Sequence, residues 1–209
     1  MIGVIGAGAF GTALAIAIAK AGQPVVLWAR SSKQAQEMRV NRHNSVYLPD
    51  ARLPDAVTPT NTMNDLSNAQ TLLLAVPLQQ VRSVLKTTKP PVRSFVACCK
   101  GIELGTGLGP TGVIKDALPD AETAILTGPS FAADIAVGRP TALTLACEDD
   151  TRGEALQTLL TTPTLRLYRT TDTIGAELGG ALKNVMAIAC GAVMGADLGN
   201  SARAAIMTR

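Results

Sequence analysis

One lysine stands inside a helical run of small and apolar residues, Glu177-Leu178-Gly179-Gly180-Ala181-Leu182-Lys183-Asn184. Side chains on a helix lean back over the preceding turn, which here holds Gly179 and Gly180. The amine of Lys183 therefore projects across a surface without side chains. Each interior glycine costs about 1 kcal/mol of helix stability relative to alanine, so the pair indicates space kept clear for a molecule that the amine contacts. A solvated lysine on a closely packed helix stays the alternative.

The apolar residues of this helix predict a buried face. Leu178, Leu182, Val185 and Ala189 recur at helical spacing, so we expect them to pack against the core. The apolar run from Val185 to Ala196 is too short to span a bilayer.

A second group of residues with chemical potential is Gly6-Ala7-Gly8-Ala9-Phe10-Gly11, which follows one predicted strand and precedes an Ala-rich helix. This context is required for a dinucleotide-binding fingerprint. Gly6 makes the tight turn, Gly8 lets a pyrophosphate approach the backbone, and Gly11 lets helix and strand pack closely. The helix N-terminus supplies free N–H groups for the phosphates.

The end of the next strand bears on cofactor choice. An NAD site usually places an acidic residue there to hold the ribose hydroxyls. This chain has Arg30 followed by Ser31 and Ser32, and an arginine can pair with a 2′-phosphate. NADP(H) is therefore favoured, while stacking of Arg30 on adenine would also tolerate NAD(H). An ordinary surface arginine is the alternative.

Three further candidates follow predicted strands, where a parallel sheet collects its chemistry. Val76-Pro77 ends one strand, Lys100-Gly101 follows another, and Thr127-Gly128-Pro129-Ser130-Phe131-Ala132 follows a third. The Lys100 amine suits a small anionic substrate. The turn at Gly128 can present backbone N–H groups and the Ser130 hydroxyl to the same substrate.

The elements that must position these residues alternate along the chain. Helix-compatible segments, such as Thr12–Ala21 and Leu78–Thr87, separate several predicted strands. This alternation predicts an α/β protein with a doubly wound Rossmann-type sheet. From residue 174 the pattern is all helical, so we expect a dinucleotide-binding domain at 1–173 and the beginning of a helical domain at 174–209. The predicted strands are Ile2–Ile5, Val25–Trp28, Thr71–Val76, Ser94–Cys98, Ala124–Leu126, Ala142–Ala146 and Leu165–Tyr168.

The composition of the 209 residues excludes several classes of protein. Hydrophobic residues make up 47% and aromatic ones 3%, with a net charge of +3, so the core must be aliphatic and a nucleic-acid surface has little support. A signal peptide is not expected, because the first charge, Lys20, follows the apolar N-terminal segment. A membrane span is not expected there either, because Gly3, Gly6, Gly8 and Gly11 would weaken a membrane helix. The cysteines lack the spacing of a metal site, and we expect no metal and reduced core thiols at Cys98, Cys99, Cys147 and Cys190.

Taken together and in order, these motifs resemble the NAD(P)-dependent glycerol-3-phosphate dehydrogenases of the bacterial type. The resemblance covers essentially the whole chain. The motifs Gly128-Pro-Ser-Phe-Ala and Glu177-Leu-Gly-Gly-Ala-Leu-Lys-Asn are quite specific to that family. The motifs are Gly6-Ala-Gly-Ala-Phe-Gly-Thr-Ala-Leu-Ala, Ala75-Val-Pro, Lys100-Gly, Gly128-Pro-Ser-Phe-Ala and Glu177-Leu-Gly-Gly-Ala-Leu-Lys-Asn. The stretch from Asn41 to Pro49 and Asn200-Ser-Ala-Arg also match the family's pattern.

The resemblance implies a reaction and roles for residues. Hydride would pass between NAD(P)H and C2 of dihydroxyacetone phosphate, giving sn-glycerol 3-phosphate for phospholipid synthesis in the cytoplasm. Lys183 would be the catalytic proton donor and acceptor at the C2 oxygen, helped by a pKa lowered through burial or a second cation, for which Lys100 is the candidate. The substrate pocket would contain Lys100, Gly128, Ser130 and Lys183, with Asn184 less certain. The cofactor would contact Gly6, Gly8, Ala9, Phe10, Gly11, Arg30, Lys100 and Ala132.

Some alternatives stay open at this point. Family members continue beyond Arg209 with helices that complete the active site, so we expect an incomplete helical domain. The other readings are a related lysine-using hydroxy-acid or 6-phosphogluconate-type dehydrogenase, and a non-catalytic NADP-binding protein. His43, the only histidine, is expected in a surface turn rather than in acid–base chemistry. A homodimer is left open.

Overall fold

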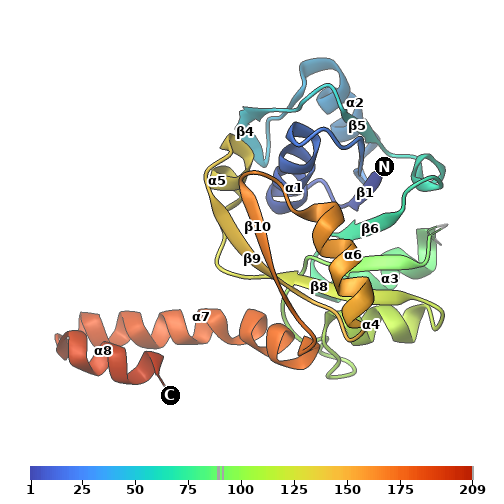
Figure 1. The fold of residues 1–209 in the computed structure, drawn as a ribbon. Coiled ribbons are helices and arrows are strands. Elements are labelled where there is room, and N and C mark those ends of the chain that lie inside the picture. Colours follow the sequence, from blue (N-terminus) through green and yellow to red (C-terminus); the bar gives the residue numbers. More distant parts are fainter. Residues whose placement is uncertain (89, 91, 209) are drawn as a thin grey trace.

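An eight-stranded sheet forms the centre of the computed structural model, which describes residues 1–88, 90 and 92–208 (Figure 1). Its strands are β1 (Ile2–Ile5), β2 (Val25–Trp28), β5 (Val57–Thr60), β6 (Thr71–Leu74), β7 (Ser94–Ala97), β8 (Glu122–Thr127), β9 (Thr141–Ala146) and β10 (Leu165–Thr170). They lie in the order β10-β9-β8-β7-β6-β1-β2-β5. Neighbours are parallel except for β8 and β9, which pair antiparallel. The expected Rossmann-type fold is confirmed.

Helices connect these strands and cover the sheet. They are α1 (Ala9–Lys20), α2 (Ser32–Asn41), α3 (Leu78–Thr88), α4 (Pro110–Ala117), α5 (Ala132–Val137) and α6 (Asp150–Leu160), with a 3-10 helix η1 at Met63–Leu66. A small hairpin of β3 (His43–Asn44) and β4 (Leu48–Arg52) follows α2. Two further helices, α7 (Thr173–Gly195) and α8 (Gly199–Met207), end the described part of the chain.

The core is aliphatic, as the composition predicted. Every residue of α1 from Gly11 to Ala19 is buried, and its alanines and glycine let the helix approach the sheet and α5 closely. Cys98, Cys99 and Cys147 are buried free thiols, whereas Cys190 is only partly buried. Burial raises the pKa of the Cys99 thiol to about 12, which keeps it protonated and unreactive.

The predicted strands all exist, and their limits differ by a few residues. The edge strand β5 was not predicted. It contains Pro59, which has no N–H for a sheet and normally argues against a strand. At the edge of a sheet a proline is tolerated, because only one side of the strand needs partners, and β5 pairs with β2 alone.

The prediction that one face of α7 packs against the core was wrong. Leu178, Leu182 and Val185 are 43%, 51% and 59% exposed, and Ala189 is only partly buried. The physical reason is visible in Figure 1, where α7 extends away from the sheet and only α8 folds back along it. Helical periodicity identifies the apolar face correctly but does not say which element covers it.

The length of α7 also exceeds that of the apolar run on which the membrane argument rested. The helix starts at Thr173 and has 23 residues. By length and composition alone it is the one helix of the described residues that could cross a membrane, which is weak evidence for a span. Its first turns are attached to the sheet domain by the polar contacts described below.

Candidate functional site

The strand order creates a crevice at the carboxyl edge of the sheet. Strand β1 lies between β2 and β6 in the sheet. The connection after β1 leads to β2 on one side, and the connection after β6 leads to β7 on the other side, so the loops after β1 and β6 diverge. Ligands of open α/β sheets bind at such a switch point. Because β1, β2, β6, β7 and β8 are all parallel, the residues that follow them gather along this one edge.

The glycine-rich turn after β1 has the geometry that its three glycines predict. Gly6 has a φ of +114°, and a Cβ there would lie 2.6 Å from the Ala75 carbonyl oxygen. A Cβ on Gly11 would lie 2.0 Å from the Gly6 carbonyl oxygen. Around Gly8, no other part of the described chain comes within 4 Å of such a Cβ. Gly6 and Gly11 therefore serve close packing of the chain, whereas Gly8 borders open space.

A cavity of about 400 Å³ opens beside this turn. Arg30 and Ser31, at the end of β2, line it together with Gly6 and Gly8. Several other side chains of the lining were not among the predicted cofactor contacts. These are Trp28, Gln34, Tyr47, Gln80 and Val84.

The remaining predicted cofactor residues lie at two helix starts. Ala9 and Phe10 begin α1, and Ala132 begins α5. Phe10 and Ala132 are partly buried and pack against the same core cluster. Neither lines the 400 Å³ cavity.

Two lysines meet at the ends of β7 and β8. The Lys100 ammonium donates a hydrogen bond to the Gly128 carbonyl oxygen at 3.3 Å. The pKa of Lys100 is lowered, first because the amine is partly buried and next because the Lys183 amine lies beside it. The pair of amines predicted from the sequence is therefore present.

Glycines on α7 make this approach close. A Cβ on Gly180 would lie 2.9 Å from Thr127 Oγ1 and 3.6 Å from Lys100 Cγ. Among the described residues outside the helix, none lies within 4 Å of a Cβ on Gly179. Gly180 thus lets α7 pack on β8, and Gly179 leaves space next to Lys183.

That space is a cavity of about 330 Å³. Its wall combines the turn after β8, one residue of β9 and one face of α7: Thr127, Gly128, Pro129, Thr144, Gly175, Ala176, Gly179, Gly180 and Lys183. The Ser130 hydroxyl, one residue beyond this lining, is buried without a hydrogen-bond partner in the described structure. Asn184 is exposed and absent from the lining.

A carboxylate that the sequence analysis did not assign holds α7 in place. Glu177 Oε1 accepts hydrogen bonds from the Thr111 backbone N–H at 2.7 Å and from the Thr111 hydroxyl at 2.8 Å. Thr111 lies in the first turn of α4, where N–H groups have no partner within the helix. The start of the lysine helix is therefore bonded to the sheet domain.

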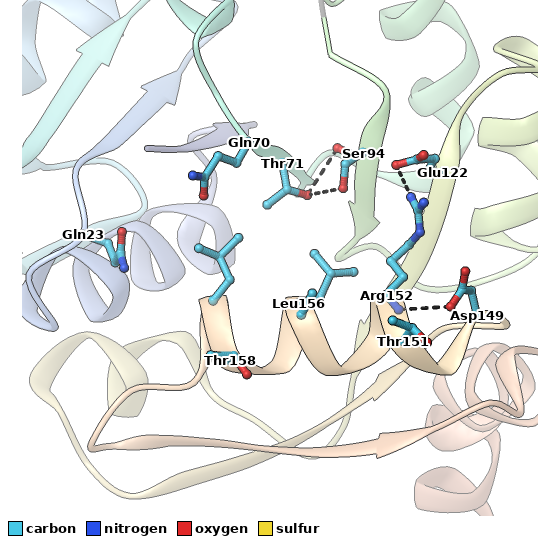
Figure 2. A pocket seen from close by; sticks show the side chains of 12 residues that line it. Gln23, Gln70, Thr71, Ser94, Glu122, Asp149, Thr151, Arg152, Leu156 and Thr158 are labelled. Atoms are coloured by element: carbon cyan, nitrogen blue, oxygen red, sulfur yellow. Dashed lines mark hydrogen bonds and ion pairs between the residues drawn. The ribbon is translucent and has the colours of Figure 1, made fainter.

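A larger cavity, of about 840 Å³, lies at the opposite edge of the sheet (Figure 2). Thr71, Ser94 and Glu122, the first residues of β6, β7 and β8, line it. Figure 2 shows their polar groups bonded locally, Thr71 to Ser94 at 3.0 Å and Glu122 to Arg152. It holds none of the predicted site residues, so we place the site at the carboxyl edge.

His43 has no part in the two cavities at the carboxyl edge. It is half-buried in β3 rather than in a turn, and its Nδ1 lies 3.2 Å from the Pro49 carbonyl oxygen. Among the residues that the structure describes, no group of three or more His, Cys, Asp or Glu could hold a metal ion.

The carboxyl edge fits a dinucleotide. The open space at Gly8 adjoins the first turn of α1, which carries no acidic residue to repel phosphate. The Trp28 indole N–H, in the wall of the 400 Å³ cavity, has no protein partner among the described residues. Arg30 adds a positive charge to the same wall.

Comparison with protein families assigns both parts of the chain. Residues 1–152 match the model of the NAD-dependent glycerol-3-phosphate dehydrogenase N-terminus, and residues 172–209 match that of its C-terminus.

Individual relatives agree with these matches. The chain is 59% identical to the glycerol-3-phosphate dehydrogenase [NAD(P)+] of Ruegeria sp. and 57% identical to that of Roseobacter denitrificans. It aligns over its whole length and spans 65% of the length of each. Among solved structures, the glycerol-3-phosphate dehydrogenase of Coxiella burnetii is 34% identical, with a TM-score of 0.87 over 99% of this chain and 65% of that one. The Plasmodium falciparum glycerol-3-phosphate dehydrogenase, 23% identical over 98% of this chain and 61% of that one, shares the fold with a TM-score of 0.88.

Proposed function

Because this chain belongs to the NAD-dependent glycerol-3-phosphate dehydrogenase family, we propose that it reduces dihydroxyacetone phosphate to sn-glycerol 3-phosphate with NAD(P)H. The observation that carries the proposal is the position of Lys183. It lies on a 330 Å³ cavity beside Lys100, at the same edge of the sheet as the glycine-rich turn.

In the proposed reaction Lys183 is the proton donor. When bound, the reduced nicotinamide supplies the hydride for C2 of the substrate. The Lys183 ammonium stabilises the negative charge that grows on the C2 oxygen and gives it a proton. In the reverse direction the neutral amine takes the proton from the C2 hydroxyl.

Lys100, Gly128 and Ser130 are proposed to bind the phosphate substrate. The Lys100 amine is held by the Gly128 carbonyl at 3.3 Å, which aims it at the turn after β8. The buried Ser130 hydroxyl lies next to this turn and has no hydrogen-bond partner in the described structure. A positive charge and a hydroxyl suit a small anionic substrate.

The cofactor is proposed to be NADP(H) in preference to NAD(H). Arg30 lines the cavity at the end of β2, where it can pair with a 2′-phosphate. Gly6, Gly8 and Gly11 shape the turn. We propose that Ala9, Phe10 and Ala132 contact the cofactor toward its nicotinamide end, and that Lys100 contacts both cofactor and substrate.

The domain boundaries, the cellular location and the oligomeric state are also part of the proposal. We divide the chain into a dinucleotide-binding domain, residues 1–173, and the beginning of a helical substrate domain, residues 174–209. The relatives are bacterial proteins, which supports a cytoplasmic enzyme without a membrane span. A homodimer would be tested by the molar mass in solution.

The test is to mix the chain with NADPH and follow the loss of NADPH absorbance after adding dihydroxyacetone phosphate. Oxidation that requires this substrate supports the proposal. Turnover only with a hydroxy-acid or 6-phosphogluconate couple would assign a related dehydrogenase instead. NADPH binding without turnover on any of these substrates would make the chain a non-catalytic nucleotide-binding protein.

A further inference from the structure

The side chain of Asn44 is buried and bonded to the glycine-rich turn. It is 1% exposed, and its Nδ2 donates hydrogen bonds to the Ala7 carbonyl oxygen at 3.0 Å and to Thr12 Oγ1 at 2.8 Å. Ala7 belongs to the glycine-rich turn and Thr12 to helix α1, and both lie more than thirty residues earlier in the chain. A buried amide is costly unless it is bonded, so this contact fixes the hairpin of β3 and β4 to the turn.

A second amide binds the same carbonyl. Gln34 Nε2, from α2, donates to the Ala7 carbonyl oxygen at 2.8 Å and to Asn44 Oδ1 at 3.4 Å. One backbone oxygen of the turn thus receives two side-chain amides from two different elements. We call Asn44 and Gln34 the amide clamp.

The orientation of this carbonyl decides where a neighbouring donor points. The Ala7 carbonyl and the Gly8 N–H belong to one planar peptide group, in which they point in opposite directions. Because the clamp holds the oxygen on the protein side, the Gly8 N–H faces away from it. Ala7 and Gly8 both line the 400 Å³ cavity, and a Cβ at Gly8 would meet open space, so the chain leaves room for a ligand beside this peptide group.

The clamp also connects the parts of the cofactor cavity. Gln34 lies in the first turn of α2, whose N-cap, Ser31, accepts a hydrogen bond from the Gln34 N–H. The segment that follows Asn44 carries Tyr47, which lines the same cavity as Arg30. The turn, the start of α2 and the hairpin therefore meet at one carbonyl.

We propose that Asn44, together with Gln34, is a positioning residue for dinucleotide binding. The amide clamp holds the Ala7–Gly8 peptide so that its N–H is ready to bind the pyrophosphate, without contacting the cofactor through the Asn44 side chain. This inference rests on the proposed function, because it assumes that a dinucleotide binds at the turn.

The test measures binding, since the clamp acts before any chemistry. Trp28 is the only tryptophan and lies in the wall of the cavity, so its fluorescence reports NADPH binding directly. Asn44→Ala is expected to raise the Kd for NADPH about tenfold, the effect of one lost hydrogen bond of typical net strength. Gln34→Ala, at a half-buried position that tolerates truncation better, is expected to raise it several-fold.

A matched control separates positioning from general destabilisation. Thr12→Val removes the other partner of Asn44 Nδ2 and leaves the Ala7 contact intact. It should lower Tm, as Asn44→Ala does, while the Kd for NADPH stays within about twofold. Adenosine 2′-monophosphate, which has no pyrophosphate, should bind Asn44→Ala as tightly as it binds the wild type.

The outcomes distinguish the inference from the proposed function. Unchanged NADPH affinity in both clamp variants overturns the inference alone, as does an equal loss in Thr12→Val or an equal loss of adenosine 2′-monophosphate. A wild-type chain that binds neither NADPH nor NADH overturns the proposed function and the inference with it.

Discussion

The Glu177 carboxylate reaches from the first turns of α7 to Thr111, whose backbone N–H and hydroxyl donate to the same oxygen at 2.7 and 2.8 Å. Gly109 leaves room for this contact, because a Cβ there would lie 2.1 Å from Glu177 Oε2 and the carboxylate would have to shift. A negative charge at the start of α4 also interacts favourably with the helix dipole. The helix that carries Lys183 is therefore attached to the sheet domain by an acid that takes no part in the proposed chemistry.

Removing this carboxylate should loosen α7. Glu177→Ala leaves the Thr111 donors without their partner, and we expect a loss of about 1–3 kcal/mol in the free energy of unfolding. Urea titration measures the loss, and hydrogen exchange of α7 amides locates it. Glu177→Gln keeps an acceptor oxygen and should lose less. Equal losses in the two variants would mean that the hydrogen bonds to Thr111 contribute little.

Alanine substitutions at Gly11 and Gly8 should affect different properties of the protein, the first its stability and the second its binding of NADPH. Gly11→Ala places a Cβ 2.0 Å from the Gly6 carbonyl and should destabilise the fold by about 2 kcal/mol or more. The Cβ of Gly8→Ala meets no described residue within 4 Å apart from its chain neighbours, so the substitution should cost only about 1 kcal/mol, as a helix N-cap, while weakening NADPH binding. Thermal unfolding and Trp28 fluorescence measure the two properties. A Gly8→Ala chain that binds NADPH as tightly as wild type would contradict the assignment of this space to the cofactor.

The loop that follows Lys100 should be stabilised by an ionised Glu103. Hydrogen bonds from Arg82 and Thr106 lower the pKa of Glu103 from its ordinary 4.5 to about 2. A carboxyl whose pKa is lowered by folding stabilises the protein fully above its unfolded value, and this stabilisation is lost as pH falls through the folded value.

This sign predicts how a neutral variant behaves. The Tm of Glu103→Gln should be below that of wild type at pH 7, and the difference should shrink between pH 4.5 and pH 2. Calorimetry across this range measures it. A difference that stays constant with pH would show that the charge of Glu103 does not stabilise the loop.

Arg30 should determine the preference between the two dinucleotides. Loss of a charge-assisted hydrogen bond to a phosphate costs about 1.5–3 kcal/mol, so Arg30→Ala should raise the Kd for NADPH about ten- to hundredfold. The Kd for NADH should change little. Competitive fluorescence titration of the two cofactors measures both constants. Equal weakening would instead indicate that Arg30 stacks on the adenine.

Local patterns predicted the glycine-rich turn well. The turn between β1 and α1 is set by neighbours in sequence, so the spacing of Gly6, Gly8 and Gly11 was sufficient to identify it. The strand ends that carry Arg30, Lys100 and Gly128 followed from the parallel sheet, because all of its carboxyl ends share one edge.

Contacts between segments far apart in the chain could not be predicted from the sequence. Neither the bond of Glu177 to Thr111 nor that of Asn44 to Ala7 has a periodicity or a local spacing that could reveal it. The exposed apolar face of α7 was mispredicted for the same reason. An apolar stripe indicates that a helix face favours burial, but it does not identify the element that covers that face. Strand β5 was not predicted, and the place of Pro59 at the edge of the sheet is likewise set by the tertiary fold.

The measurement that tests the central claim most directly compares wild type with Lys183→Met, which keeps an unbranched side chain and removes the amine. We predict that both chains bind NADPH with Kd values within about twofold, because Lys183 lies outside the wall of the 400 Å³ cavity. Wild type should oxidise NADPH with dihydroxyacetone phosphate, and the variant should be slower by about two orders of magnitude or more, as expected for loss of a general acid. Unchanged turnover in Lys183→Met, or a wild type that binds NADPH and never turns over, would contradict the account.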